Sequence, residues 1–78
     1  MALKNIEIFT EMEMKLFDLL ISLGFTKCET EKHIYFKNKN EVFIFPHELY
    51  AHHYIATRKQ LDMNGWINYD DFNKILGI

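Results

Sequence analysis

Residues 25–46 constrain the fold most, because they hold three short segments rich in aromatic and β-branched residues. The segments cover residues 25–30, 33–38 and 41–46, with short polar breaks between them. This composition is typical of β-strands, and connections this short join antiparallel neighbours. We therefore predict a three-stranded antiparallel meander.

Alternation within these segments predicts which side chains share a face of the sheet. In the second segment His33, Tyr35 and Lys37 fall on one face, whereas Ile34 and Phe36 fall on the other. The third segment, 41–46, has apolar residues on both faces. It is therefore expected to be a central strand, or a strand covered on both sides.

A helix is predicted on the amino-terminal side of the strands, over residues 11–23. Thr10 and Glu13 have the spacing of a capping box, and Phe9 with Met14 has that of a hydrophobic staple. Gly24 is the expected left-handed residue that ends this helix, with Phe25 folding back on Leu20. The expected apolar face consists of Met14, Phe17, Leu20 and Ile21.

Two further helices are predicted after the strands. The first runs from about Ala51 to Asn64 and ends at Gly65, with Trp66 folding back on Leu61. One side of it is expected to be lined by Ala51, Tyr54, Arg58 and Leu61, with Ile55 beside them. The last helix begins after Asn68, a good N-cap, and reaches Leu76, with Asp70 and Asp71 in its first turn.

The chain of 78 residues is expected to form a single domain, residues 1–78, of the α+β class. The predicted order is α-β-β-β-α plus a short C-terminal helix. A net charge of −2 does not indicate a strongly basic nucleic-acid binder. No apolar run approaches the roughly 20 residues that span a membrane. The single cysteine, Cys28, fits a reducing compartment, so a cytoplasmic location is expected.

Residues 60–71 resemble a calcium-binding EF-hand loop. With Gly65 at the sixth position, Asp62, Asn64, Asn68 and Asp71 fall at ligand positions. The first position, however, is Gln60, where an aspartate is required. We therefore interpret the segment as a helix end followed by a helix start, and keep weak calcium binding as an alternative.

Histidines around the start of the second helix suggest zinc as another metal. His47, His52 and His53 are close in sequence, and Cys28 could add a thiolate. Adjacent helical residues point about 100° apart, so His52 and His53 are not expected to face one ion. No metal and no cofactor is therefore predicted.

His33 is the best candidate for a catalytic residue. It opens the second strand, where a side chain is held firmly, and imidazole is the usual general acid or base near neutral pH. Tyr35 shares its face. A phosphate-contacting rim around it is expected from Lys32, Lys37, Lys39, Arg58 and Lys59. The alternative is a surface histidine in a β-hairpin beside solvated lysines.

Several of these motifs together resemble the HicA toxin family. They are "GF" after the first helix, His33 at the start of "HIYFK", Pro46–His47 after the third strand, and Arg58, Leu61 and Gly65 of the closing helix. The resemblance covers residues 10–66, and residues 67–78 are an extension. It implies a double-stranded-RNA-binding-domain-like fold, cleavage of messenger RNA with His33 as the catalytic residue, and control by a cognate antitoxin.

A non-catalytic protein-interaction module on the same scaffold is the second hypothesis. The family's Gly-Ser before the histidine is Glu31–Lys32 here, and the chain is slightly acidic. Tyr50, Tyr54 and Trp66 are expected to be exposed aromatics of the kind that contact partner proteins. A homodimer is also compatible with the sequence, because a three-stranded sheet leaves two edges.

Overall fold

The computed structural model describes the backbone of residues 2–78 and the side chains of residues 11–78. It confirms the α+β class and the order α-β-β-β-α-α. The elements are α1 (Ala2–Ser22), β1 (Thr26–Glu29), β2 (His33–Asn38), β3 (Glu41–Pro46), α2 (Ala51–Met63) and α3 (Tyr69–Leu76).

The sheet is the predicted antiparallel meander, with strand order β1-β2-β3. Phe36 on β2 faces Lys27 on β1 and Phe43 on β3. The third strand is therefore an edge strand, and the expectation of a central or doubly covered strand was wrong. Its inward residues Phe43 and Phe45 are buried, but Val42 and Ile44 are 39% and 57% exposed.

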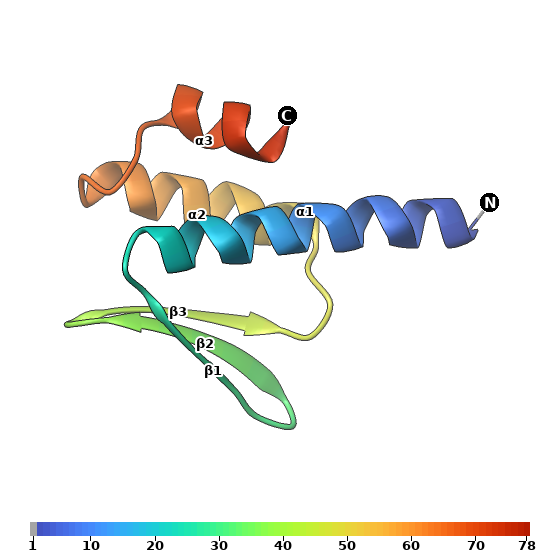
Figure 1. Ribbon diagram of the computed structural model, residues 1–78, viewed down its shortest axis with the longest axis horizontal. Coiled ribbons are helices and arrows are strands. Elements are labelled where there is room, and N and C mark those ends of the chain that lie inside the picture. Colours follow the sequence, from blue (N-terminus) through green and yellow to red (C-terminus); the bar gives the residue numbers. More distant parts are fainter. Residues whose placement is uncertain (1) are drawn as a thin grey trace.

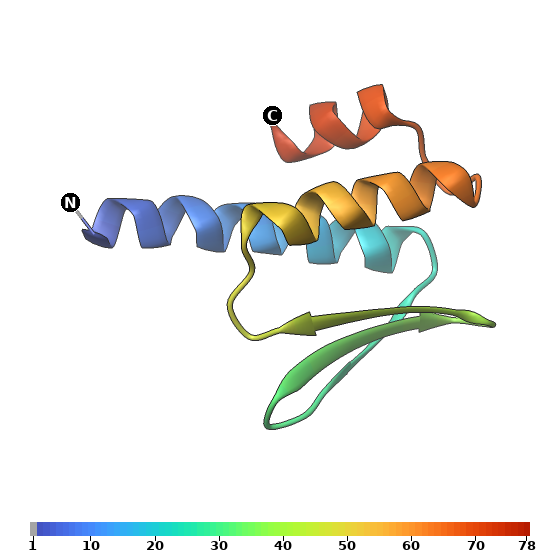
Figure 2. The same cartoon turned by 180° about the vertical axis from the view of Figure 1, so that it is seen from behind.

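Both long helices lie over the same face of the sheet, and α3 lies on the side of these helices that faces away from it (Figures 1 and 2). No described element covers the opposite face, which we call the outer face. Strand alternation places eight residues on it: Thr26, Cys28, His33, Tyr35, Lys37, Val42, Ile44 and Pro46.

The first helix differs from its prediction at its start and in its buried face. It begins at Ala2, so Thr10 lies within it and cannot be its N-cap. The carboxylate of Glu13 instead accepts a hydrogen bond from the backbone N–H of Leu49 at 3.3 Å. The side chain of Phe9, the other half of the predicted staple, lies outside the described side chains.

The buried face of α1 differs from the predicted one. Leu16, Leu19 and Leu20 are buried, whereas Met14 and Ile21 are 60% and 51% exposed. Leu20 belongs to both sets, and Phe17 is half-buried against the core. The two sets differ because several apolar spacings coexist on this helix, and the positions of both the sheet and α3 decide which residues are covered.

Glycines end the first two helices as predicted. Phe25 N–H donates to Leu20 O and Gly24 N–H donates to Ile21 O, both at 3.0 Å. The same pair of bonds recurs at Gly65 and Trp66, and both glycines have positive φ, 96° and 78°. These are the bonds of a Schellman motif, which only a residue tolerating a left-handed backbone completes without strain.

The hydrophobic core includes residues from all three layers: the sheet, the pair of helices α1 and α2, and helix α3. Its largest fully buried side chains come from α1, β2, α2 and α3: Leu16, Leu20, Phe36, Leu61, Phe72 and Leu76. On α2 the buried residues are Tyr54, Thr57 and Leu61, while Ile55 is 56% exposed. Among the described helices, none is long and apolar enough to cross a membrane.

Candidate functional site

His33 lies at the start of β2 on the outer face, with its side chain exposed. The two-residue turn before it is closed by Thr30, whose N–H donates to His33 O at 2.8 Å. The Thr30 hydroxyl also accepts from the His33 N–H at 3.1 Å. These bonds fix the backbone that carries the imidazole, as expected for a residue at a strand end.

Tyr35 is the nearest aromatic neighbour of His33 on the same face. The two ring centroids are 6.0 Å apart and the rings are tilted by 58°. Across the strands, Tyr35 lies between Cys28 on β1 and Ile44 on β3. The centre of the outer face is therefore partly apolar, with the imidazole at one end.

The predicted basic residues divide between two sides of the molecule. Lys37 is exposed on the outer face, Lys32 lies in the turn before His33, and Lys39 lies in the β2–β3 turn. Lys59 is on α2, which lies over the opposite face of the sheet (Figure 1). The structure therefore brings His33, Tyr35 and Lys37 together but does not bring Lys59 to them.

Arg58 has structural contacts on α2. Its Nη1 donates to the side-chain oxygen of Asn73 at 3.0 Å, and its guanidinium lies 4.6 Å from the ring centroid of Tyr69. Both partners belong to α3, so Arg58 holds α3 against α2. This contact with the C-terminal helix could not be anticipated from a motif that ends at Gly65.

The three aromatics predicted at a partner surface have different environments. Tyr50 is 54% exposed, as expected, but Tyr54 is only 4% exposed, so its predicted exposure was wrong. Tyr54 is buried because its face of α2 packs on the core. Burial, followed by the charge of Glu13, raises the pKa of Tyr54 to about 12. Trp66 is half-buried, with its ring centroid 4.9 Å from that of Phe25.

The calcium-like segment forms the predicted helix end and helix start. Gln60 and Asn64 both donate to the carboxylate of Glu41, so they are turned toward β3. Asn68 caps α3 by accepting from Asp71 N–H at 2.8 Å. Among the described residues, no three histidine, cysteine, aspartate or glutamate side chains are grouped so that they could hold a metal ion.

The histidines near α2 are arranged differently from the prediction. The rings of His52 and His53 lie 4.0 Å apart between centroids, although the two residues are adjacent on the helix. His53 Nδ1 accepts a hydrogen bond from Tyr50 N–H at 2.8 Å, whereas His47 Nε2 lies 2.9 Å from Thr30 O. Burial, and next the neighbouring His52, lower the pKa of His53.

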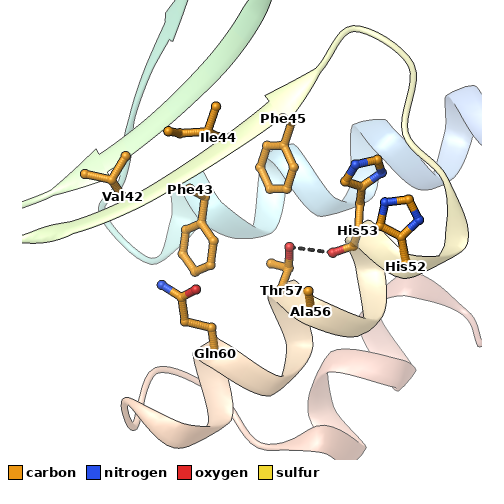
Figure 3. Close-up of a pocket in the computed structure, with 9 residues that line it drawn as sticks. All are labelled: Val42, Phe43, Ile44, Phe45, His52, His53, Ala56, Thr57 and Gln60. Atoms are coloured by element: carbon orange, nitrogen blue, oxygen red, sulfur yellow. Dashed lines mark hydrogen bonds between the residues drawn. The ribbon is translucent and has the colours of Figure 1, made fainter.

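One surface feature was not predicted from the sequence: a groove between the edge strand β3 and helix α2 (Figure 3). We call it the edge groove. Its volume is about 170 Å³. The exposed β-branched residues of 41–46 were its only sequence signal, and they were interpreted as buried. It is lined by Val42, Phe43, Ile44, Phe45, His52, His53, Ala56, Thr57 and Gln60.

No protein family model, curated protein sequence or solved structure matches this chain.

Proposed function

We propose that this chain is a HicA-like toxin that binds RNA on the outer face of its sheet and cleaves it with His33. The position of His33 carries the proposal. Its exposed imidazole stands at the first residue of β2, beside Tyr35, on a face that no described element covers. Imidazole suits proton transfer near neutral pH, and an uncovered face leaves room for a strand of RNA.

The neighbours of His33 have the chemistry that RNA binding requires. Tyr35 offers a ring on which a base can stack, and Lys32 and Lys37 offer charges to phosphates on either side of it. Lys39 extends the positive rim to the far end of β2. Arg58 and Lys59, on the helical side, contribute to long-range attraction only.

Cleavage in this proposal requires no metal ion, because the ribose 2′-OH is the nucleophile. Its oxygen attacks the adjacent phosphorus as its proton leaves, and the bond from phosphorus to the 5′-oxygen of the next nucleotide breaks. That oxygen takes up a proton, which leaves a 2′,3′-cyclic phosphate and a free 5′-OH. His33 performs one proton transfer and water the other, so turnover is slow. A cognate antitoxin would block the reaction by covering the His33 face.

A non-catalytic interaction module is the second candidate function, and the exposed apolar residues favour it. Val42 and Ile44 are 39% and 57% exposed, and they adjoin Lys37 and Tyr35 across the strands. A partner protein on this face would bury apolar area that bound RNA would leave exposed to solvent.

Induced expression in bacteria separates the two functions. The wild-type chain is expected to arrest growth, and His33→Ala to relieve the arrest at equal protein levels. His52→Ala is the matched control and should arrest growth like the wild type, since His52 is also an exposed histidine but lies on α2, over the opposite face of the sheet. Equal, harmless growth of all three strains would reject the nuclease and favour the interaction module.

The salt dependence of RNA binding tests, independently of catalysis, whether RNA binds on the outer face. With a single-stranded oligoribonucleotide, Lys37→Gln should lower the slope of log K against log salt by about 0.7, the value for one lost phosphate contact. Lys59→Gln, on α2, should leave the slope unchanged. Equal slopes for both variants would place RNA elsewhere than the outer face.

A further inference from the structure

The backbone of β3 offers hydrogen-bonding groups to a further strand. The bond from Thr30 N–H to His33 O makes these two residues a hydrogen-bonded pair. Such pairs alternate along antiparallel strands, so Tyr35 bonds to Cys28 on β1 rather than to Ile44 opposite it on β3. The N–H and C=O of Ile44 therefore point away from the sheet.

The same alternation applies to Val42, two residues earlier, whose N–H and C=O also point outward. Phe43 and Phe45 bond inward to β2 instead. The outward row is short, because Pro46 has no N–H at the next outward position. The edge can therefore accept two hydrogen-bonded pairs from an incoming strand, at Val42 and at Ile44.

The edge groove lies beside this row, on the helical side of the sheet. Figure 3 shows His52 and His53 near Phe45 at one end and Gln60 near Phe43 at the other, with Thr57 and Ala56 between. A strand added to β3 would direct alternate side chains into the groove. The volume of about 170 Å³ is similar to the roughly 150 Å³ cavity that admits a benzene-sized group, so one branched or aromatic side chain fits.

At the end of the groove near Phe45, charge complementarity indicates which kind of ligand side chain fits. The groove lining includes no acidic side chain, and its only titratable groups are His52 and His53. Because His53 Nδ1 accepts the N–H of Tyr50, the neutral ring carries its proton on Nε2 and is a donor there. An acidic side chain is the complement of two adjacent imidazoles.

We propose that the edge groove binds an extended peptide segment of another protein, which pairs antiparallel with β3. The segment has an acidic residue opposite Phe45 and a branched or aromatic residue two positions later, opposite Phe43. The residues between and after them pair with Ile44 and Val42 and add their side chains to the outer face. This site goes beyond the RNA-directed function and does not depend on the activity of His33.

The test uses a fluorescein-labelled peptide with the sequence glutamate, valine, leucine, threonine, flanked by serine residues on both sides. It is expected to bind the full chain and to slow hydrogen exchange at the amides of Val42 and Ile44, which face water in the free chain. Replacing its glutamate with lysine should weaken binding at least about tenfold, the scale of one lost charged hydrogen bond. Methylating the backbone nitrogens of its valine and threonine should abolish binding.

Two matched pairs of variants locate the site on the chain. Ile44→Pro removes an outward N–H without removing a bond to β2 and should abolish binding, whereas Ile44→Thr keeps the N–H and should bind. Ala56→Trp fills the groove and should abolish binding, whereas Ile55→Trp, at an exposed position of the same helix outside the groove lining, should not.

Three results would overturn the proposal. One is the absence of binding by the probe peptide at millimolar concentration. Another is binding that Ile44→Pro and Ala56→Trp leave unchanged. The third is protection of the Val42 and Ile44 amides without peptide that rises with protein concentration, since the occupant of the edge would then be a second copy of this chain.

Discussion

Glu41 connects the start of β3 to the end of α2. Its carboxylate accepts hydrogen bonds from Gln60 Nε2 at 2.7 Å, from Trp66 Nε1 at 3.0 Å and from the side chain of Asn64. The bond from Gln60, and next that from Trp66, lower the pKa of Glu41, because they favour the charged form. One carboxylate thereby fixes both the helix end and the half-buried indole.

Because of this network, the stability of the fold varies with pH in the acidic range. The folded-state pKa of Glu41 lies below its ordinary value of 4.5, so its contribution is fully present above pH 4.5 and is lost as pH falls through the lowered pKa. In urea titrations, Glu41→Gln should lower the free energy of unfolding at pH 7 by about 1–2 kcal/mol. The deficit should shrink below pH 4.5. Glu11→Gln, at an exposed position of α1, should show no deficit at either pH.

At the scale of elements, the Schellman motifs that end α1 at Gly24 and α2 at Gly65 differ in their surroundings. A Cβ at Gly65 would meet nothing within 4 Å, whereas a Cβ at Gly24 would lie 3.1 Å from the Nδ2 atom of Asn38. That amide donates to Leu23 O at 3.4 Å, so the β2 residue before the turn holds the end of α1. The second ending lacks this contact.

Alanine substitutions at the two glycines should therefore have unequal effects. Gly65→Ala is expected to cost about 1–2 kcal/mol, the strain of a left-handed backbone alone. Gly24→Ala should cost more, because the Asn38 amide must also move. Thermal and urea unfolding of both variants measures the difference, and equal losses would show that Asn38 does not constrain this turn.

For the molecule as a whole, α3 is part of the core although none of the motifs recognised in residues 10–66 includes it. Phe72 and Leu76 are 1% and 2% exposed, and Arg58 holds the helix from α2. Residues 67–78 therefore complete a third layer and are not an independent extension.

Phe72→Ala should consequently destabilise the entire chain and not only its last helix. The expected loss is about 3–5 kcal/mol, as for other large-to-small substitutions in cores. Ile75→Ala, on the same helix but 46% exposed, should cost less than about 1 kcal/mol. If Phe72→Ala released α3 alone and left cooperative unfolding of the sheet unchanged, α3 would be a separate unit.

Features set by nearby residues were predictable from the sequence. The helix ends at Gly24 and Gly65, the cap at Asn68 and the alternation of β2 each depend on residues a few positions apart. The start of α1 was not predictable, because Thr10 and Glu13 form a valid local cap signal. The helix continues through them, and Glu13 bonds to Leu49, 36 residues away.

The candidate site was predictable only where it follows the strand period. His33, Tyr35 and Lys37 share a face because they alternate along β2. Which strand is central, and which face of α2 is buried, depend on how the layers stack. The exposure of Ile44 and the burial of Tyr54 were therefore missed for the same reason.

Cys28 occupies a useful position on the outer face. It is the single cysteine of the chain, it is exposed, and it pairs with Tyr35 in the strand register. A fluorophore or spin label attached to its thiol would need no engineered residue and would have no competing attachment point. Such a probe would sit on the edge strand β1 of the uncovered face, next to Tyr35, where it could report in real time whether an RNA or a protein arrives there.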